Sequence, residues 1–373
     1  MREDSFGCGT KCSVTGRREQ VELMYKPDAD RAKRYWEAFW EREIIDRPCV
    51  HVIAPREGAR QWEKPSSMRG SDGRYMEALA GFEDWAASTY FGGEAMPEFR
   101  INFGPDQFSA FLGAPLIFAP GHSTSWVEPI VTDWETAEIR MREEDGSVWQ
   151  RVLEYFRVAA EYSAGKFLIG VLDLHMNMDC LSALRGSQRL CLDLIDCPDQ
   201  VEAAMLKVRL LFPRVYDALW EAGNMSERGT LGWAPFYCSG KYNTIACDFL
   251  YLIGPEHGRR FVMPALVEEA EFLDHSVFHV DGIGSLVHLD DILAIEDIDV
   301  IQWMPGEGQT PMIEWMDLLR KVQAAGKGLQ VDCTVEQVKR VHKELRPEGV
   351  LYHVQAESVA EAEGLLEWLK NNT

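Results

Sequence analysis

Residues 277–331 read VFHVDGIGSLVHLDDILAIEDIDVIQWMPGEGQTPMIEWMDLLRKVQAAGKGLQV, and this stretch shows the repeating pattern of the chain most clearly. Short apolar runs in it predict strands at 277–280, 300–303 and 328–331. The segments between these runs have apolar residues at helical spacing. Short hydrophobic strands that alternate with helices are typical of βα units on a parallel sheet. The stretch therefore predicts a parallel α/β fold.

The same alternation extends over residues 148–370. Apolar runs predict further strands at 167–172, 230–233 and 349–352. Periodic segments predict helices at 148–164, 198–222, 255–273, 290–296, 312–325, 335–345 and 358–370. Six successive units without a Gly-rich dinucleotide fingerprint favour a TIM-type (β/α)8 barrel over a doubly wound sheet.

The chain before this regular region is less periodic. Residues 1–25 are polar and lack a period, so we expect an N-terminal tail there, followed by a single barrel domain over 26–373. A helix is predicted over 32–42 and a buried strand over 48–54. Residues 55–130 are irregular and contain several Gly and Pro residues, which indicates long insertions over one rim of the barrel.

The composition is that of a globular protein. Of 373 residues 46% are hydrophobic, and 60 acidic against 38 basic side chains give a net charge of −22. Because phosphate binding needs a concentrated basic face, we expect neither nucleic acid nor an anionic membrane as a partner. No run approaches the roughly eighteen apolar residues of a membrane span, and no signal peptide is evident, so we expect a cytoplasmic protein. Nine cysteines, an odd number, fit reduced thiols.

Functional groups of an α/β barrel lie just past the carboxyl ends of its strands. His279 and Asp281 are two residues apart at the end of a predicted strand, so their side chains point to the same side and can meet one ligand or metal. Asp173 and His175 repeat this spacing after another strand. The alternative for each pair is an aspartate that only orients a core histidine.

Two further groups lie near predicted strand ends. Cys247 could ligate zinc and Asp248 could contact a substrate, although a free cysteine is most often a small buried hydrophobe. Trp233, Trp303 and Trp315 could form an aromatic wall around a flat or methylated ligand, or could simply pack the core. The arginines nearest in sequence to these strand ends fall in the following helices. Acidic and aromatic groups then favour a neutral or cationic methylated substrate over an anionic one.

Several short motifs in residues 145–370 resemble the uroporphyrinogen decarboxylase (URO-D) superfamily. They are Asp173-Leu174-His175 followed by Leu184-Arg185-Gly186, Cys247-Asp248-Phe249 followed by Gly254-Pro255-Glu256 and Phe261-Val262-Met263-Pro264, and His279-Val280-Asp281-Gly282. The resemblance implies an α/β barrel with one of two activities. One branch decarboxylates the acetate arms of uroporphyrinogen without a cofactor, and the other moves methyl groups to or from a corrinoid protein, usually with zinc.

This chain is closer to the methyltransferase branch. The decarboxylases have an arginine-rich N-terminal loop, whereas the nearest candidate here, Gly16-Arg17-Arg18, lacks the surrounding pattern. The zinc methyltransferases have His-x-Cys-Gly where this chain has His279-Val280-Asp281-Gly282, and a second cysteine near the position of His353. The resemblance thus implies His279, Asp281 and His353 as metal ligands, with Cys333 or Cys247 competing for the third place. The oxygen ligand makes a harder site, suited to activating an ether, an amine or water.

From these observations we expect a corrinoid-dependent methyltransferase that moves a methyl group between a small methylated compound, such as an aryl methyl ether or a methylamine, and a separate corrinoid protein. The expected catalytic residues are Asp173, His175, Asp248, His279 and Asp281, and the expected substrate-binding residues are Trp233, Cys247, Gln302 and Trp303. Zinc is the expected metal, and a homodimer is among the expected assemblies. The chain lacks an Asp-x-His-x-x-Gly loop, so we expect no cobalamin bound to this chain itself. The alternatives are a cofactor-free decarboxylase or lyase, using Asp173, Asp248 and His279, and a non-catalytic binding module.

Overall fold

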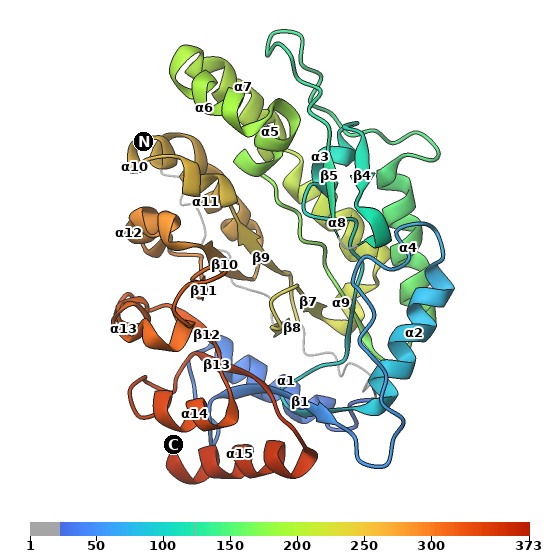
Figure 1. Ribbon diagram of the computed structural model, residues 1–373, viewed down its shortest axis with the longest axis vertical. Coiled ribbons are helices and arrows are strands. Elements are labelled where there is room, and N and C mark those ends of the chain that lie inside the picture. The colour runs from blue at the N-terminus through green and yellow to red at the C-terminus, as the bar shows by residue number, and fades with distance from the viewer. Residues whose placement is uncertain (1–22, 123) are drawn as a thin grey trace, which may run out of the picture.

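The computed structural model describes residues 23–122 and 124–373, in which strands and helices alternate (Figure 1). The strands are β1 (Cys49–Pro55), β2 (Thr89–Gly93), β3 (Glu98–Arg100), β4 (Leu116–Phe118), β5 (Ser125–Val127), β6 (Leu168–Gly170), β7 (Thr230–Leu231), β8 (Tyr237–Cys238), β9 (Tyr242–Ala246), β10 (His275–Asp281), β11 (Val300–Met304), β12 (Gly328–Asp332) and β13 (Val350–Gln355). Across the described ranges, every helix is too short or too polar to span a bilayer.

The longer helices are α1 (Ala29–Trp40), α2 (Tyr75–Ser88), α4 (Val148–Tyr162), α5 (Met178–Arg185), α6 (Ser187–Asp196), α7 (Pro198–Arg209), α8 (Phe212–Ala222), α11 (Met263–Phe272), α13 (Met316–Ala324) and α15 (Val359–Asn372). Shorter helical segments are α3 (Gln107–Phe111), η1 (Pro120–His122), α9 (Met225–Arg228), η2 (Asp248–Leu252), α10 (Pro255–His257), η3 (Gly258–Val262), η4 (Ile283–His288), α12 (Leu289–Leu293), η5 (Met312–Glu314) and α14 (Val335–Val341).

The strands form two main sheets. The larger has the order β2-β1-β13-β12-β11-β10-β9, in which all neighbours are parallel except β1 and β2. The smaller has the order β3-β6-β7-β8, with β8 antiparallel to β7. The predicted mixed α/β fold with parallel βα units is therefore confirmed.

A closed barrel, in contrast, is not formed as a continuous hydrogen-bonded ring by the residues that the structure describes. The seven-stranded and four-stranded sheets share no ladder. The reason is local at both junctions. After β7 the chain turns through Pro235 and returns as β8, which takes the edge of β7 on which a further parallel strand would pair. At the other junction β2 covers the free edge of β1 in antiparallel register.

Some helices differ from the predicted boundaries. The segment predicted as one helix over 198–222 forms α7 and α8, because the chain breaks before Phe212 and restarts with Pro213 in the first turn. Region 55–130, expected to be irregular, contains α2, whose buried side chains include Leu79, Phe82 and Trp85.

Both sheets nevertheless face one common core at their amino ends. Inner residues of strands from both sheets belong to it, together with aromatic side chains of α1 that close this end: Trp36, Phe39, Trp40, Cys49, Leu168, Leu231, Val277, Val300 and Leu351. A second core fills the space between the outer sheet faces and the surrounding helices. The strands of both sheets thus surround one interior, whose apolar floor is built by α1.

Of the predicted N-terminal tail, the structure describes only the last three residues. Leu23 is buried in the same apolar floor. Residues 1–22, including Cys8, Cys12 and the Gly16-Arg17-Arg18 segment, lie outside the described residues.

Candidate active site and metal site

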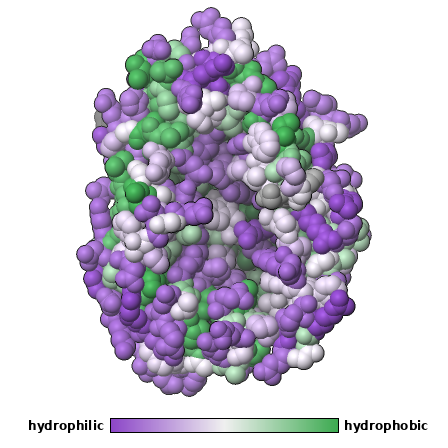
Figure 2. Space-filling model, in the orientation of Figure 1, coloured by the Kyte–Doolittle hydropathy of each residue, from purple (hydrophilic) through white to green (hydrophobic). Residues whose placement is uncertain are grey.

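The interior changes from apolar to polar along each strand. Two residues beyond the apolar floor, the same strand faces carry His51, Gly170, Trp233, His279, Gln302 and His353. Figure 2 shows a hollow near the middle of the face turned to the viewer, with hydrophilic residues lining it. The alternation of side chains in a strand therefore delivers polar groups to the interior just above the floor.

His279 on β10 is held in one orientation by its neighbours. Its Nδ1 lies 2.7 Å from Oε1 of Gln302, which faces it in register on β11. The ring of Trp233 packs edge-on against the imidazole at 4.7 Å between centroids. Burial lowers the pKa of His279, so the ring is neutral near pH 7. Because an amide oxygen only accepts, Nδ1 donates the proton and the lone pair of Nε2 remains for a ligand.

His175 has the opposite character. Its Nε2 lies 3.0 Å from Asp173 and its Nδ1 lies 3.2 Å from Asp179. Burial opposes the charged ring, but the two carboxylates outweigh it and raise the pKa of His175 well above its usual value. The residue has a positive φ of 35°, a conformation that aims the ring between the two acids. The raised pKa therefore favours the protonated, positively charged form of His175 near pH 7.

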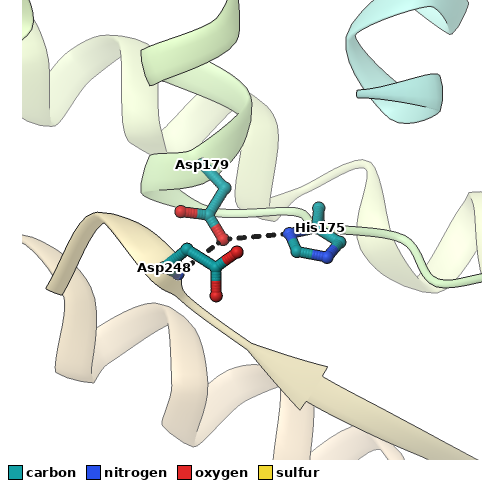
Figure 3. Close-up of side chains that lie close together, drawn as sticks. All are labelled: His175, Asp179 and Asp248. Atoms are coloured by element: carbon teal, nitrogen blue, oxygen red, sulfur yellow. Dashed lines mark hydrogen bonds and ion pairs between the residues drawn. The ribbon is translucent and has the colours of Figure 1, made fainter. Parts of the chain in front are cut away.

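Asp179 connects the loop after β6 with the loop after β9 (Figure 3). Its carboxylate accepts hydrogen bonds from the backbone N–H groups of Asp248 at 2.9 Å and Phe249 at 2.8 Å. The thiol of Cys247 donates to it at 3.7 Å. These contacts fix the first turn of η2, and with it the side chain of Asp248, beside His175.

Asp248 is the member that two groups of metal-type ligands share. Loss of water around its carboxylate, together with the negative charge of Asp179, raises the pKa of Asp248 to about 6. Asp248, His279 and Asp281 offer ligand atoms that all lie within 4.8 Å of one another, and so do His175, Asp179 and Asp248. Only the first group contains a histidine with a free lone pair, so the donor set there fits a divalent cation with one nitrogen and two carboxylate ligands.

The third ligand expected from the sequence lies elsewhere. His353 is on β13, separated from β10 by β11 and β12, a gap of roughly 14 Å at about 4.8 Å per strand. Its Nδ1 lies 2.8 Å from Asp332, and its ring packs against His51. Asp248 takes the place beside His279 and Asp281 that we expected for His353.

The two cysteines expected to compete for the metal, Cys247 and Cys333, belong to neither of these groups of ligand atoms. Burial raises the pKa of Cys247 well above its usual value, and that of Cys333 is raised for the same reason. The thiol of Cys333 donates to the carbonyl of Val331. Each thiol therefore has a hydrogen-bond partner within the protein and lies outside both groups of ligand atoms.

The two tryptophans expected to contact substrate lie on different faces of their sheets. Trp233 faces His279 in the interior and is partly exposed, so its substrate contact stays a prediction. Trp303 alternates with Gln302 on β11 and therefore points to the outer face, where it is 0% exposed and packs against Trp315 at 5.3 Å between centroids. Trp303 is a core residue and cannot line the hollow.

Three residues of this network were not among the expected site residues. Asn177, with φ of 72°, caps α5 and donates from Nδ2 to the carbonyl of Ala246 at 3.0 Å and to Glu269 at 3.2 Å. Burial raises the pKa of Glu269 to about 8. Asp179 and His175 are four residues apart, which is the one sequence signal that could have pointed to Asp179.

Comparisons with known proteins bear on the fold alone. No protein-family model matches the chain. No curated protein matches it either. Among solved structures, a methyltransferase from Methanosarcina mazei superposes with a TM-score of 0.58 at 16% sequence identity, over 94% of this chain and 99% of the other. The chain therefore shares its fold, nearly end to end, with that protein.

Proposed function

We propose that this chain is a metal-assisted methyltransferase, which moves a methyl group between a small methylated compound and a separate corrinoid protein. The observation that carries the proposal is the convergence of Asp248, His279 and Asp281 at the carboxyl ends of β9 and β10, beside the charged His175. The fold shared with a methyltransferase from Methanosarcina mazei supports the reaction class. The corrinoid partner rests on the URO-D-like motifs of the sequence.

The three side chains have distinct tasks in this proposal. Asp248, Asp281 and Nε2 of His279 would hold a divalent ion, zinc being the one that suits this donor set, and Gln302 fixes the tautomer of His279. When bound, such an ion acts as a Lewis acid toward the heteroatom that carries the methyl group. Trp233 shapes the wall beside His279 and excludes water from it.

His175 supplies the proton that the reaction requires. As the methyl group passes to the reduced cobalt of the partner protein, the electron pair of the broken bond stays on the oxygen or nitrogen of the donor. This atom then takes a proton, which His175 holds next to Asp248 and can replace through Asp173. Asp179 keeps His175 charged and oriented without contacting the substrate.

Metal analysis of purified variants tests the site. We expect about one zinc per chain in the wild type and loss of it in His279→Ala, whereas His353→Ala should keep it because His353 belongs to a different ion pair. Equal, sub-stoichiometric metal in all three proteins would remove metal chemistry from the proposal.

The corrinoid partner is tested separately. Incubation with cobalamin followed by desalting should leave no cobalamin absorbance on this chain, and methyl transfer should require an added corrinoid protein. Cobalamin retained at one per chain would contradict the division of labour between two proteins.

A cofactor-free decarboxylase or lyase is the second candidate, because Arg100 and Lys64 line a pocket close to the interior and could receive a carboxylate. In that case His175 and Asp248 would serve as acid and base. Release of CO2 by metal-free protein would favour this alternative, and metal-dependent methyl transfer would exclude it.

A further inference from the structure

A pocket of about 180 Å³ lies at the edge of the four-stranded sheet, where β3 pairs only with β6 among the described strands. The inner face of β3 contributes Glu98 and Arg100, and the loop after β1 contributes Lys64, Ser66 and Ser67. The pocket therefore lies in the junction that keeps the barrel ring open.

One buried polar atom of this pocket has no partner in the protein. Oε1 of Glu98 is shielded from solvent and has no hydrogen-bond partner among the described residues. Residue 170 on the neighbouring strand is glycine, and a side chain there would collide with this same oxygen. Gly170 thus makes room for the Glu98 carboxylate at this place. A buried acceptor without a partner normally costs free energy unless a ligand or water satisfies it.

The charges of the pocket favour an anion. Arg100 and Lys64 both act electrostatically on Glu98, and Lys64 also lies over the ring of Trp85 at 4.9 Å. Neither cation forms a direct ion pair with a carboxylate of the described residues, although the chain has many more acidic than basic residues. Two cations and one carboxylate give a net positive charge when Glu98 is ionised. Burial raises the pKa of Glu98 to about 7, so the site can also hold a neutral acid there and become more positive. One carboxylate from a ligand would offset this charge.

A second pocket differs in that its charged side chains are paired with one another. It is lined by Arg69, Arg74, Asp72 and Glu77, whose side chains form ion pairs with one another at the surface. Its positive charge is already neutralised by the protein. In the Arg100 pocket, by contrast, the two cations form no direct ion pair with any residue that the structure describes.

The Arg100 pocket is connected to the proposed metal site through Trp233. Nη1 of Arg100 donates a hydrogen bond to the carbonyl of Trp233 at 3.0 Å, and the Trp233 ring contacts His279. One hydrogen bond and one ring contact thus link the pocket to His279.

We propose that the Arg100 pocket anchors a carboxylate of the substrate while the methylated heteroatom of the same molecule reaches His279. This inference rests on the proposed function and adds to it the substrate class, a small methylated compound with one carboxylate. It also revises the neutral or cationic substrate expected from the sequence, because Arg100 and Lys64 come from the segment that was expected to be irregular. A guanidinium is suited to a planar carboxylate, which it can bind through two parallel hydrogen bonds.

Calorimetric binding of two matched probes, 4-methoxybenzoate and 4-methoxybenzamide, tests the anchor. Wild type should bind the carboxylate about tenfold or more tightly than the amide. Arg100→Gln should abolish this preference while leaving the affinity for the amide unchanged, and Lys64→Gln should reduce it. Arg100→Lys, which keeps the charge, should retain part of it. Arg74→Gln, in the neutralised pocket, is the control and should behave as wild type.

Equal affinities of wild type for the carboxylate and the amide would overturn the inference, and so would an unchanged preference in Arg100→Gln. Binding does not require methyl transfer, so His279→Ala should keep the carboxylate preference even after losing metal. If metal analysis fails and the preference persists, the proposed function falls and the anchor stands. Release of the labelled probe carboxyl group as CO2 would show a reacting group and would overturn the anchoring role.

Discussion

The carboxylate of Asp179 accepts the backbone N–H of Asp248 at 2.9 Å, across 69 residues of sequence. The same carboxylate accepts from the backbone of Phe249 and from His175. One partly buried acid thereby joins the loops that follow two strands in different sheets. Because the two sheets share no ladder, such side-chain contacts determine how the groups at their carboxyl ends meet.

Asp179→Asn should weaken this connection. An amide has one accepting oxygen in place of two, so its NH2 group would face a donor in the backbone of Asp248 or Phe249 and leave it unpaired. We expect a loss of about 1–3 kcal/mol in the free energy of unfolding and a lower pKa of His175. Urea denaturation and NMR titration of the imidazole measure the two effects.

Asp281→Asn is the matched control for stability, since the side chain of Asp281 is 50% exposed. It should leave the free energy of unfolding within about 0.5 kcal/mol of wild type. Equal stability of Asp179→Asn and Asp281→Asn would show that Asp179 does not join the two loops.

Glu269→Gln should change the pH dependence of stability. The folded protein keeps the Glu269 proton up to about pH 8, whereas an unfolded chain loses it near pH 4.3. The stability from this group is thus fully present below about pH 4.3 and is lost as the pH rises through about 8. Gln keeps the acceptor for Asn177 but does not ionise. The variant should therefore gain stability relative to wild type as pH rises, by on the order of a few kcal/mol.

Urea denaturation of both proteins at several pH values between 5 and 8.5 measures this difference. A constant gap between the two curves across the range would mean that Glu269 titrates normally in the folded protein.

The sequence predicts the βα units because each strand and helix has its own periodicity, and β10 to β13 follow this pattern closely. It does not predict the open ring, which depends on β2 and β8 occupying strand edges. Which strand covers an edge of the sheet depends on tertiary contacts, and these leave no periodic pattern in the local sequence. The helix α2 was missed for a related reason, since apolar residues such as Met76 and Ala80 lie on its exposed side and blur the helical stripe.

For the site, spacing along one strand was informative and position across strands was not. His279 and Asp281 meet because they are two residues apart on β10. Whether Asp248 or His353 lies beside them depends on the order of the strands in the sheet. Asp248 follows β9, which pairs with β10, whereas His353 lies on β13, three strands away from β10. Trp303 points away from the interior because its neighbour Gln302 points inward. In a run that is apolar throughout, the sequence does not show which residues face inward.

Cys247→Ser should retain the metal of the wild type. The thiol is buried and donates to Asp179, and a serine hydroxyl can donate in the same direction. We expect unchanged zinc stoichiometry by elemental analysis and a stability within about 1–2 kcal/mol of wild type. Loss of metal in this variant, with the fold intact by circular dichroism, would make Cys247 a ligand after all.

Gln302→Leu should weaken metal binding without removing any ligand. The side chain accepts the Nδ1 proton of His279 at 2.7 Å and thereby presents Nε2 with its lone pair toward Asp248 and Asp281. Without an acceptor at position 302, the proton is free to move to Nε2 and the ring is free to turn. Outer partners of this kind typically contribute about 10–100-fold to metal affinity, so we expect a loss in that range by competition with a chelator. Gln302→Glu restores an acceptor and should recover much of the affinity.

Gln330, in register on β12, donates to Asp332 instead, so Gln330→Leu is the control and should bind as wild type. Equal affinities of Gln302→Leu and Gln330→Leu would show that Gln302 does not position His279 for a metal.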